Sequence, residues 1–152
     1  DPFTSPIVVF HNKKIEQIES QNLQSTAHTH QAIDSSLECF SMVMGKLLNQ
    51  YKVTAKKKNE KISQIMDDNF FATLRTYINL RYNKLVEKLY SSAYSLNEEE
   101  INIICLELCR FPNAILWTYS NCINPHSLFN KKKIIAKKVN NASSIKDIPN
   151  MI

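Results

Sequence analysis

The 152-residue chain contains a single glycine, Gly45. Tight hairpins, phosphate-binding loops and Rossmann crossovers need backbone at positive φ, which glycine supplies at the lowest steric cost. Gly45 lies between Met44 and Lys46 in a segment whose apolar residues have helical spacing, so it marks no such turn. These architectures are therefore disfavoured, and the sequence predicts an all-α fold.

The formal net charge of +5 is compatible with two interpretations. A basic balance suits nucleic acid or another anionic surface as the partner, but a charge of this size is also ordinary for solubility. The position of the charge along the chain therefore matters more than its sum.

The cysteines and histidines lack the spacing of a metal site. No CxxC pair occurs, the histidines have no matched spacing, and Cys105 and Cys109 are four residues apart, on one face of a helix. We therefore expect no metal and no cofactor, and we interpret these cysteines as small apolar core residues. Free cysteines in a core are typical of a reducing compartment.

No apolar run approaches the length of a membrane span, and a cytoplasmic location is predicted.

The first 34 residues are predicted to form a partly irregular N-terminal extension. Pro2 and Pro6 accompany a short apolar run at residues 7–10, and a polar stretch at residues 20–30 follows. This composition is typical of a surface loop or a weak helix.

Residues 35–94 are predicted to form a long helical linker or a dimerisation region. One helix is expected from Ser35, because its apolar residues follow three–four spacing; they are Leu37, Phe40, Met44, Leu47 and Tyr51. Five lysines then lie between residues 52 and 61, which indicates a solvated connector or a phosphate-contacting patch. A second long helix is predicted over residues 62–90. The two helices would pair within the chain or across a homodimer.

Residues 95–140 are predicted to contain three helices. Ser95 and Glu98 have the spacing of a capping box, and the glutamates at 98–100 suit the first turn of a helix that ends before Pro112. A short helix at 112–119, a break, and a helix at 125–139 with Asn124 as its N-cap follow. This layout matches a helix-turn-helix unit, whose last helix lies in the major groove of DNA.

The last predicted helix carries the candidate DNA contacts. It contains five lysines and no acidic residue, although a lysine-rich face is often only solvated. Double-stranded DNA is the expected partner, and the expected contact residues are Ser127, Asn130, Lys131, Lys132, Lys133 and Lys137. A helical protein-interaction module without DNA binding is the alternative. An enzyme with a small-molecule substrate is not expected, because no catalytic constellation is recognisable.

The segment from Phe71 onward resembles the C-terminal region of bacterial regulators with a degenerate LuxR-type helix-turn-helix. The similarity lies in residues 96–101, in the turn at residues 111–113 and in the serine-and-lysine helix at 127–139. It implies a transcriptional regulator, with a sensor region and a membrane anchor upstream in a longer chain, and leaves residues 141–152 as a tail. The family commonly has glycine where Arg110 stands, and arginines where this chain has lysines. Lysine lacks the planar fork of arginine. The lysines therefore favour contact with the DNA backbone over base reading.

Overall fold

The computed structural model describes residues 5–20, 26–50, 64–120, 122 and 124–152. None of these residues lies in a strand, so the predicted all-α class is confirmed. The helices are α1 (Ser5–Ser20), α2 (Thr26–Gln50), α4 (Asp68–Arg81), α5 (Leu85–Leu89), α6 (Glu98–Leu108), α7 (Asn113–Ser120), α8 (Pro125–Lys138) and α9 (Ile148–Met151), with 3-10 turns η1 (Ser92–Tyr94) and η2 (Ile145–Asp147).

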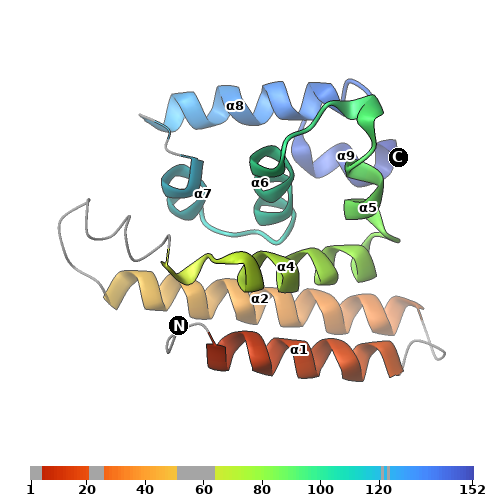
Figure 1. The fold of residues 1–152 in the computed structure, drawn as a ribbon, viewed down its shortest axis with the longest axis vertical. Helices are drawn as coiled ribbons and strands as arrows, with labels where there is room; N and C mark the ends of the chain where they lie inside the picture. The colour runs from red at the N-terminus through yellow and green to blue at the C-terminus, as the bar shows by residue number, and fades with distance from the viewer. Residues whose placement is uncertain (1–4, 21–25, 51–63, 121, 123) are drawn as a thin grey trace.

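The helices are arranged in layers (Figure 1). The long helices α1, α2 and α4 lie side by side, and each contacts the other two. The short helices α5, α6 and α7 lie between this layer and α8, which runs along the opposite side of the molecule. Because α8 is an outermost helix, one of its faces is left open to solvent.

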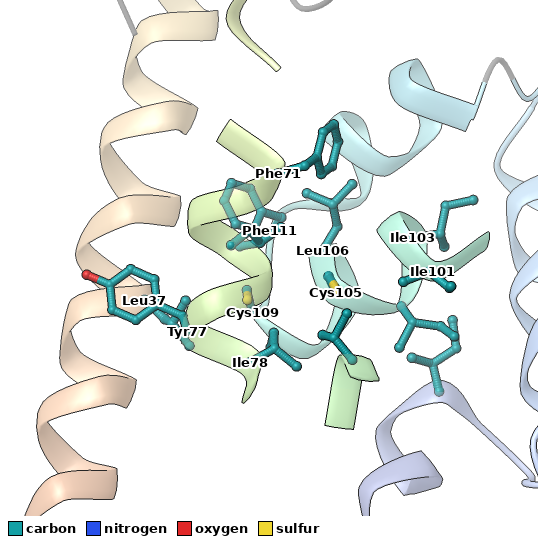
Figure 2. Packing of buried hydrophobic residues seen from close by; sticks show 14 of the residues in the cluster. Leu37, Phe71, Tyr77, Ile78, Ile101, Ile103, Cys105, Leu106, Cys109 and Phe111 are labelled. Carbon is teal, nitrogen blue, oxygen red and sulfur yellow. The ribbon is translucent and has the colours of Figure 1, made fainter. Parts of the chain in front are cut away.

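Helix α6 lies at the centre of the core. Its residues from Glu100 to Leu106 are all buried, and it contacts α4, α7, α8 and η2. An amphipathic helix buries only one face, yet Ile103 and Leu106, on the other side of the helix axis from Ile101, are as buried as Ile101 (Figure 2). A short helix that is apolar nearly all round is stable only when other elements cover every side of it.

The prediction that residues 1–34 form a partly irregular N-terminal extension did not include helix α1, which spans Ser5–Ser20. Val8, His11, Ile15 and Ile18 are buried along one side of this helix, so the buried stripe includes a histidine. His11 Nδ1 and Tyr77 Oη of α4 lie 2.6 Å apart and form a hydrogen bond. The helical spacing of this stripe is incomplete in the sequence, because one of its positions holds a histidine, which is buried less often than valine or isoleucine.

Helix α2 begins at Thr26, nine residues before the predicted start at Ser35. The predicted stripe of Leu37, Phe40 and Met44 is buried, which confirms that part of it. The side chain of Leu47, Tyr51 and the lysine run at 52–61 lie outside the described residues. Since α1 and α4 pack against α2 within one chain, no second subunit is needed to cover this stripe.

The single helix predicted over residues 62–90 is wrong. Met66 and Asp67 lie outside helices, and Asp67 caps α4 by accepting a hydrogen bond from the Phe70 amide at 2.9 Å. A second break follows α4, where Asn83 and Lys84 have positive φ before α5 begins. Apolar spacing continues across both breaks, so it could not reveal them.

The start of α6 differs from the prediction by two residues. Asn97, not Ser95, is the N-cap: its side chain accepts from the Glu100 amide at 2.8 Å, and the Glu100 carboxylate accepts from the Asn97 amide at 3.0 Å. Both residue pairs have capping-box spacing in the sequence. The observed start places Glu100 at the third helical position, and Ser95 lies in the preceding left-handed turn.

Helix α6 ends in a Schellman motif that contains no glycine. Arg110 has φ 61° and its amide donates to the Glu107 carbonyl, while the Phe111 amide donates to the Leu106 carbonyl at 3.1 Å. Phe111 is buried, which supplies the apolar contact that usually accompanies this motif. The position where LuxR-type modules commonly have glycine is thus a left-handed position in this chain.

The last residues are part of the core and not only a tail. Ala142, Ile145 and Ile148 are buried in the same apolar cluster as residues of all the longer helices. Residues 1–34, 35–94 and 95–140, which were predicted as separate regions, all contribute to that cluster. Within the described ranges, no helix is both long and apolar enough to cross a membrane.

Replacing Arg110 by glycine is expected to stabilise the protein by about 0.5–1 kcal/mol. A residue with a Cβ in the left-handed conformation costs about 1–2 kcal/mol, which glycine avoids. Part of this stabilisation is lost, because glycine raises the conformational entropy of the unfolded chain. Urea denaturation measures the free energy of unfolding. Arg110→Ala is the control, because it removes the same side chain but keeps the Cβ. Equal stability of the two variants would contradict the prediction.

The buried His11 is expected to make stability fall as the pH drops from 6.5 to about 4. Burial lowers the pKa of His11 from 6.5 to about 4, with a further contribution from nearby Lys14. In that window the unfolded chain binds a proton that the folded chain does not, so unfolding is favoured by about 2–3 kcal/mol at pH 4. His11→Phe should reduce this loss in urea titrations at several pH values, whereas His126→Gln, at an exposed position, should leave it unchanged.

Candidate nucleic-acid interface

Helix α8 is held in place at its start and along its inner side. Asn124 is the N-cap, as predicted, and its side chain accepts from the Ser127 amide at 2.8 Å. Leu128, Ile135 and Ala136 are buried against the rest of the protein. The helix therefore has a defined inner side and an equally defined outer side.

Helices α6, α7 and α8 contact one another pairwise. Figure 1 shows α6 and α7 nearly end-on, with α8 running across both of them. Pro112 lies just before α7 and its carbonyl accepts from the Ile115 amide, so the predicted helix start is displaced by one residue. The order and the short lengths of these helices are those of the predicted three-helix layout.

Three of the five lysines of α8 form ion pairs with glutamates of α6. Lys131 Nζ lies 2.6 Å from Glu99, and Lys138 Nζ lies 2.8 Å from Glu100. The third pair, Lys132 with Glu107, has a distance of 2.7 Å. These contacts neutralise much of the positive charge that the sequence shows along the helix.

The Lys132 pair is the least accessible of the three. The side chains of Lys132 and Glu107 are only 19% and 16% exposed, compared with 33% and 45% for Lys131 and Glu99. Lys132 Nζ also donates to the Asn113 side chain at the start of α7, at 2.8 Å. Lys132 thus joins α8 to α6 and α7 and does not face outward.

The outer face of α8 consists of six side chains, defined here as His126, Phe129, Asn130, Lys133, Ile134 and Lys137, all of which are exposed. Lys133 Nζ lies 4.5 Å from the centre of the Phe129 ring. Within the part of the chain that the structure describes, neither Lys133 nor Lys137 forms an ion pair. Their positive charge is therefore available to an external ligand.

The six predicted contact residues fall into three groups. Asn130, Lys133 and Lys137 lie on the outer face, whereas Lys132 faces inward. Lys131 and Ser127 lie at the edge of the outer face and are half-buried. The Ser127 hydroxyl donates to the Asn124 side chain at 3.2 Å. Sequence reasoning omitted the exposed Phe129 and Ile134, although their positions relative to the inner residues Leu128 and Ile135 already place them outside.

A polar network joins α4, α6 and α7. Arg75 of α4 donates to the Asn102 side chain of α6 at 2.6 Å, and Asn102 donates to the Tyr119 hydroxyl of α7 at 2.9 Å. Arg75 also pairs with Glu98 at 3.0 Å. Tyr119 is half-buried here, whereas the nearby Trp117 is exposed and its indole donates to the Cys122 carbonyl.

The buried thiols belong to the core, as predicted. Cys105 and Cys109 are at most 2% exposed, and burial raises the pKa of Cys105 to about 12 and that of Cys109 well above its usual value. A thiol that stays protonated is a poor nucleophile and a poor metal ligand. In the described ranges, no three His, Cys, Asp or Glu residues are grouped to hold a metal ion.

No family model, curated protein or solved structure matches this chain. The resemblance to LuxR-type modules therefore rests on the residues quoted above. Any functional proposal depends on the geometry and charge of the site itself.

Replacing Lys132 by methionine is expected to destabilise the fold by about 1–3 kcal/mol. The substitution leaves the poorly exposed Glu107 carboxylate without its counter-charge. Lys137→Met is the matched control, since this lysine is exposed without an ion pair, and it should change the free energy of unfolding by less than about 0.5 kcal/mol. Equal effects of the two substitutions in urea denaturation would contradict the assignment of Lys132 to the interior.

Proposed function

We propose that this protein binds double-stranded DNA by placing the outer face of α8 in the major groove. The observation that carries the proposal is the position of Lys133 and Lys137 beside Asn130 on an outermost helix that contains no acidic residue. An α-helix fits the major groove, and lysines beside it can contact the phosphates of the backbone. On the resemblance to LuxR-type modules, we extend the proposal to a cytoplasmic transcriptional regulator.

The proposal divides the lysines of α8 into those expected to contact DNA and those that hold the helix in place. Lys133 and Lys137 are the primary phosphate contacts, because no internal ion pair has to be broken. Lys131 forms a partly exposed pair with Glu99, and such pairs contribute only about 0–1 kcal/mol. It can therefore exchange its glutamate for a phosphate at little cost, whereas Lys132 remains bound to Glu107.

A protein-interaction function is the second candidate, because Phe129 and Ile134 are both more than half exposed. Large apolar side chains on a surface are typical of docking sites for another protein. This candidate predicts that substitution of the lysines has little effect and that substitution of these two apolar residues is decisive.

The test is the double substitution Lys133→Glu with Lys137→Glu. Fluorescence anisotropy with duplex DNA should show binding at low salt that weakens on the order of 10–100-fold in the variant, because two phosphate contacts become repulsive. The dependence of affinity on salt should also become shallower, by roughly 0.9 per lost contact.

The control is Lys13→Glu with Lys14→Glu, on the outer side of α1. Both double variants reduce the formal net charge from +5 by four units to +1, so they differ only in the position of the change. The control should bind nearly as well as the parent protein. Equal loss in both variants would show a nonspecific charge effect, and unchanged binding in the α8 variant would refute the proposal.

A further inference from the structure

Two large apolar side chains project from a helix face that is otherwise polar and cationic. Phe129 is 53% exposed, and Ile134, at 59%, is the most exposed large apolar side chain in the described part of the chain. Neither is needed for packing, because Leu128, Ile135 and Val139 fill the inner side of the same segment. Their exposure thus requires a different explanation.

Phe129 and Ile134 lie at the two edges of the outer face. At 100° per residue, five positions separate their directions by about 140° around the helix axis. Asn130 points between them, as do Lys133 and Lys137. The face therefore presents a central polar strip with an apolar group on either side.

The rotation of α8 about its axis is fixed by ion pairs on and beside its inner side. Lys131 and Lys138 are paired with Glu99 and Glu100 along one flank, and Lys132 is paired with Glu107 within the inner side. A roll of the helix would break these pairs and expose buried Leu128 and Ile135. A ligand therefore meets the same strip each time it binds.

This strip has the groups that recognise A·T base pairs in the major groove. Asparagine forms paired hydrogen bonds with N6 and N7 of adenine, and apolar side chains contact the methyl group of thymine. The groups that favour G·C pairs are a basic group on guanine and a carboxylate that accepts from cytosine. Helix α8 has neither arginine nor an acidic residue, and its two outer lysines, Lys133 over the Phe129 ring and Lys137, are assigned to the phosphates.

We propose that the outer face of α8 selects A·T-rich DNA, with Asn130 bonding to adenine and with Phe129 and Ile134 contacting thymine methyl groups. The long side chains of Lys133 and Lys137 extend from the strip to the phosphates at the edge of the groove and contribute affinity without sequence preference. The inference rests on the DNA-binding function proposed above and specifies the sequence class that the site accepts.

The experiment begins with selection of bound duplexes from a random-sequence DNA pool by the full chain. The selected core should be A·T-rich. The preferred duplex is then synthesised with uracil in place of thymine, which removes the major-groove methyl groups and preserves base pairing. Affinity should fall about 3–10-fold, as expected for the loss of one or two buried methyl contacts.

Variants separate base reading from backbone binding. Phe129→Ala with Ile134→Ala should bind thymine and uracil duplexes equally well, and Asn130→Ala should lose the preference for adenine at one position. Met42→Ala, which removes an exposed apolar residue of α2, should change neither result. Circular dichroism would verify that each variant is folded.

The outcomes distinguish this inference from the proposed function. A G·C-rich core, an unselected pool or equal binding of thymine and uracil duplexes by the parent protein would overturn the A·T proposal alone. Failure to retain any duplex at low salt would overturn both. In that case, self-association that disappears in the Phe129→Ala and Ile134→Ala variant would assign the face to protein contact.

Discussion

The burial of α6 on every side is the constraint on which the rest of the structure depends. Helices α4, α7 and α8 and turn η2 all contact it, so each is positioned relative to one short helix (Figure 2). Ile101, Ile103 and Leu106 are fully buried in different directions around its axis. The hydrophobic effect is non-directional, so burial alone does not fix how the elements are oriented. These elements share a single core because all of them pack around one apolar helix.

The first turn of α6 forms directional contacts, namely ion pairs, with the neighbouring helices. Glu98, Glu99 and Glu100 complement the helix dipole and also pair with cations, Glu98 with Arg75 of α4 and the other two with lysines of α8. The same acidic turn that starts the central helix thus also pairs with lysines of α8, beside the apolar residues that form its inner side. Positive charge that appears uniform in the sequence is thereby divided between structural pairs and an open outer strip.

Helix ends show where composition was an incomplete guide. One glycine predicted few left-handed positions, yet Asn83, Ser95, Arg110 and Asn140 are among six non-glycine residues with positive φ in the described part of the chain. Asparagine tolerates this conformation, and at Arg110 the buried Phe111 and two backbone hydrogen bonds offset the cost. Apolar spacing continues across residues 66–67 and 83–84, so it did not predict the breaks within residues 62–90.

The sequence by itself determined the helical class, the Asn124 cap and the inner side of α8, since these depend on composition and on residues three or four positions apart. It placed Asn130, Lys133 and Lys137 correctly on an open face. Only the tertiary structure decided that Lys132 faces inward, because its partner Glu107 is 25 positions away in the chain. The buried role of His11 likewise depends on Tyr77. Pairs between residues on different helices leave no periodic pattern in the sequence, so only the tertiary structure identifies them.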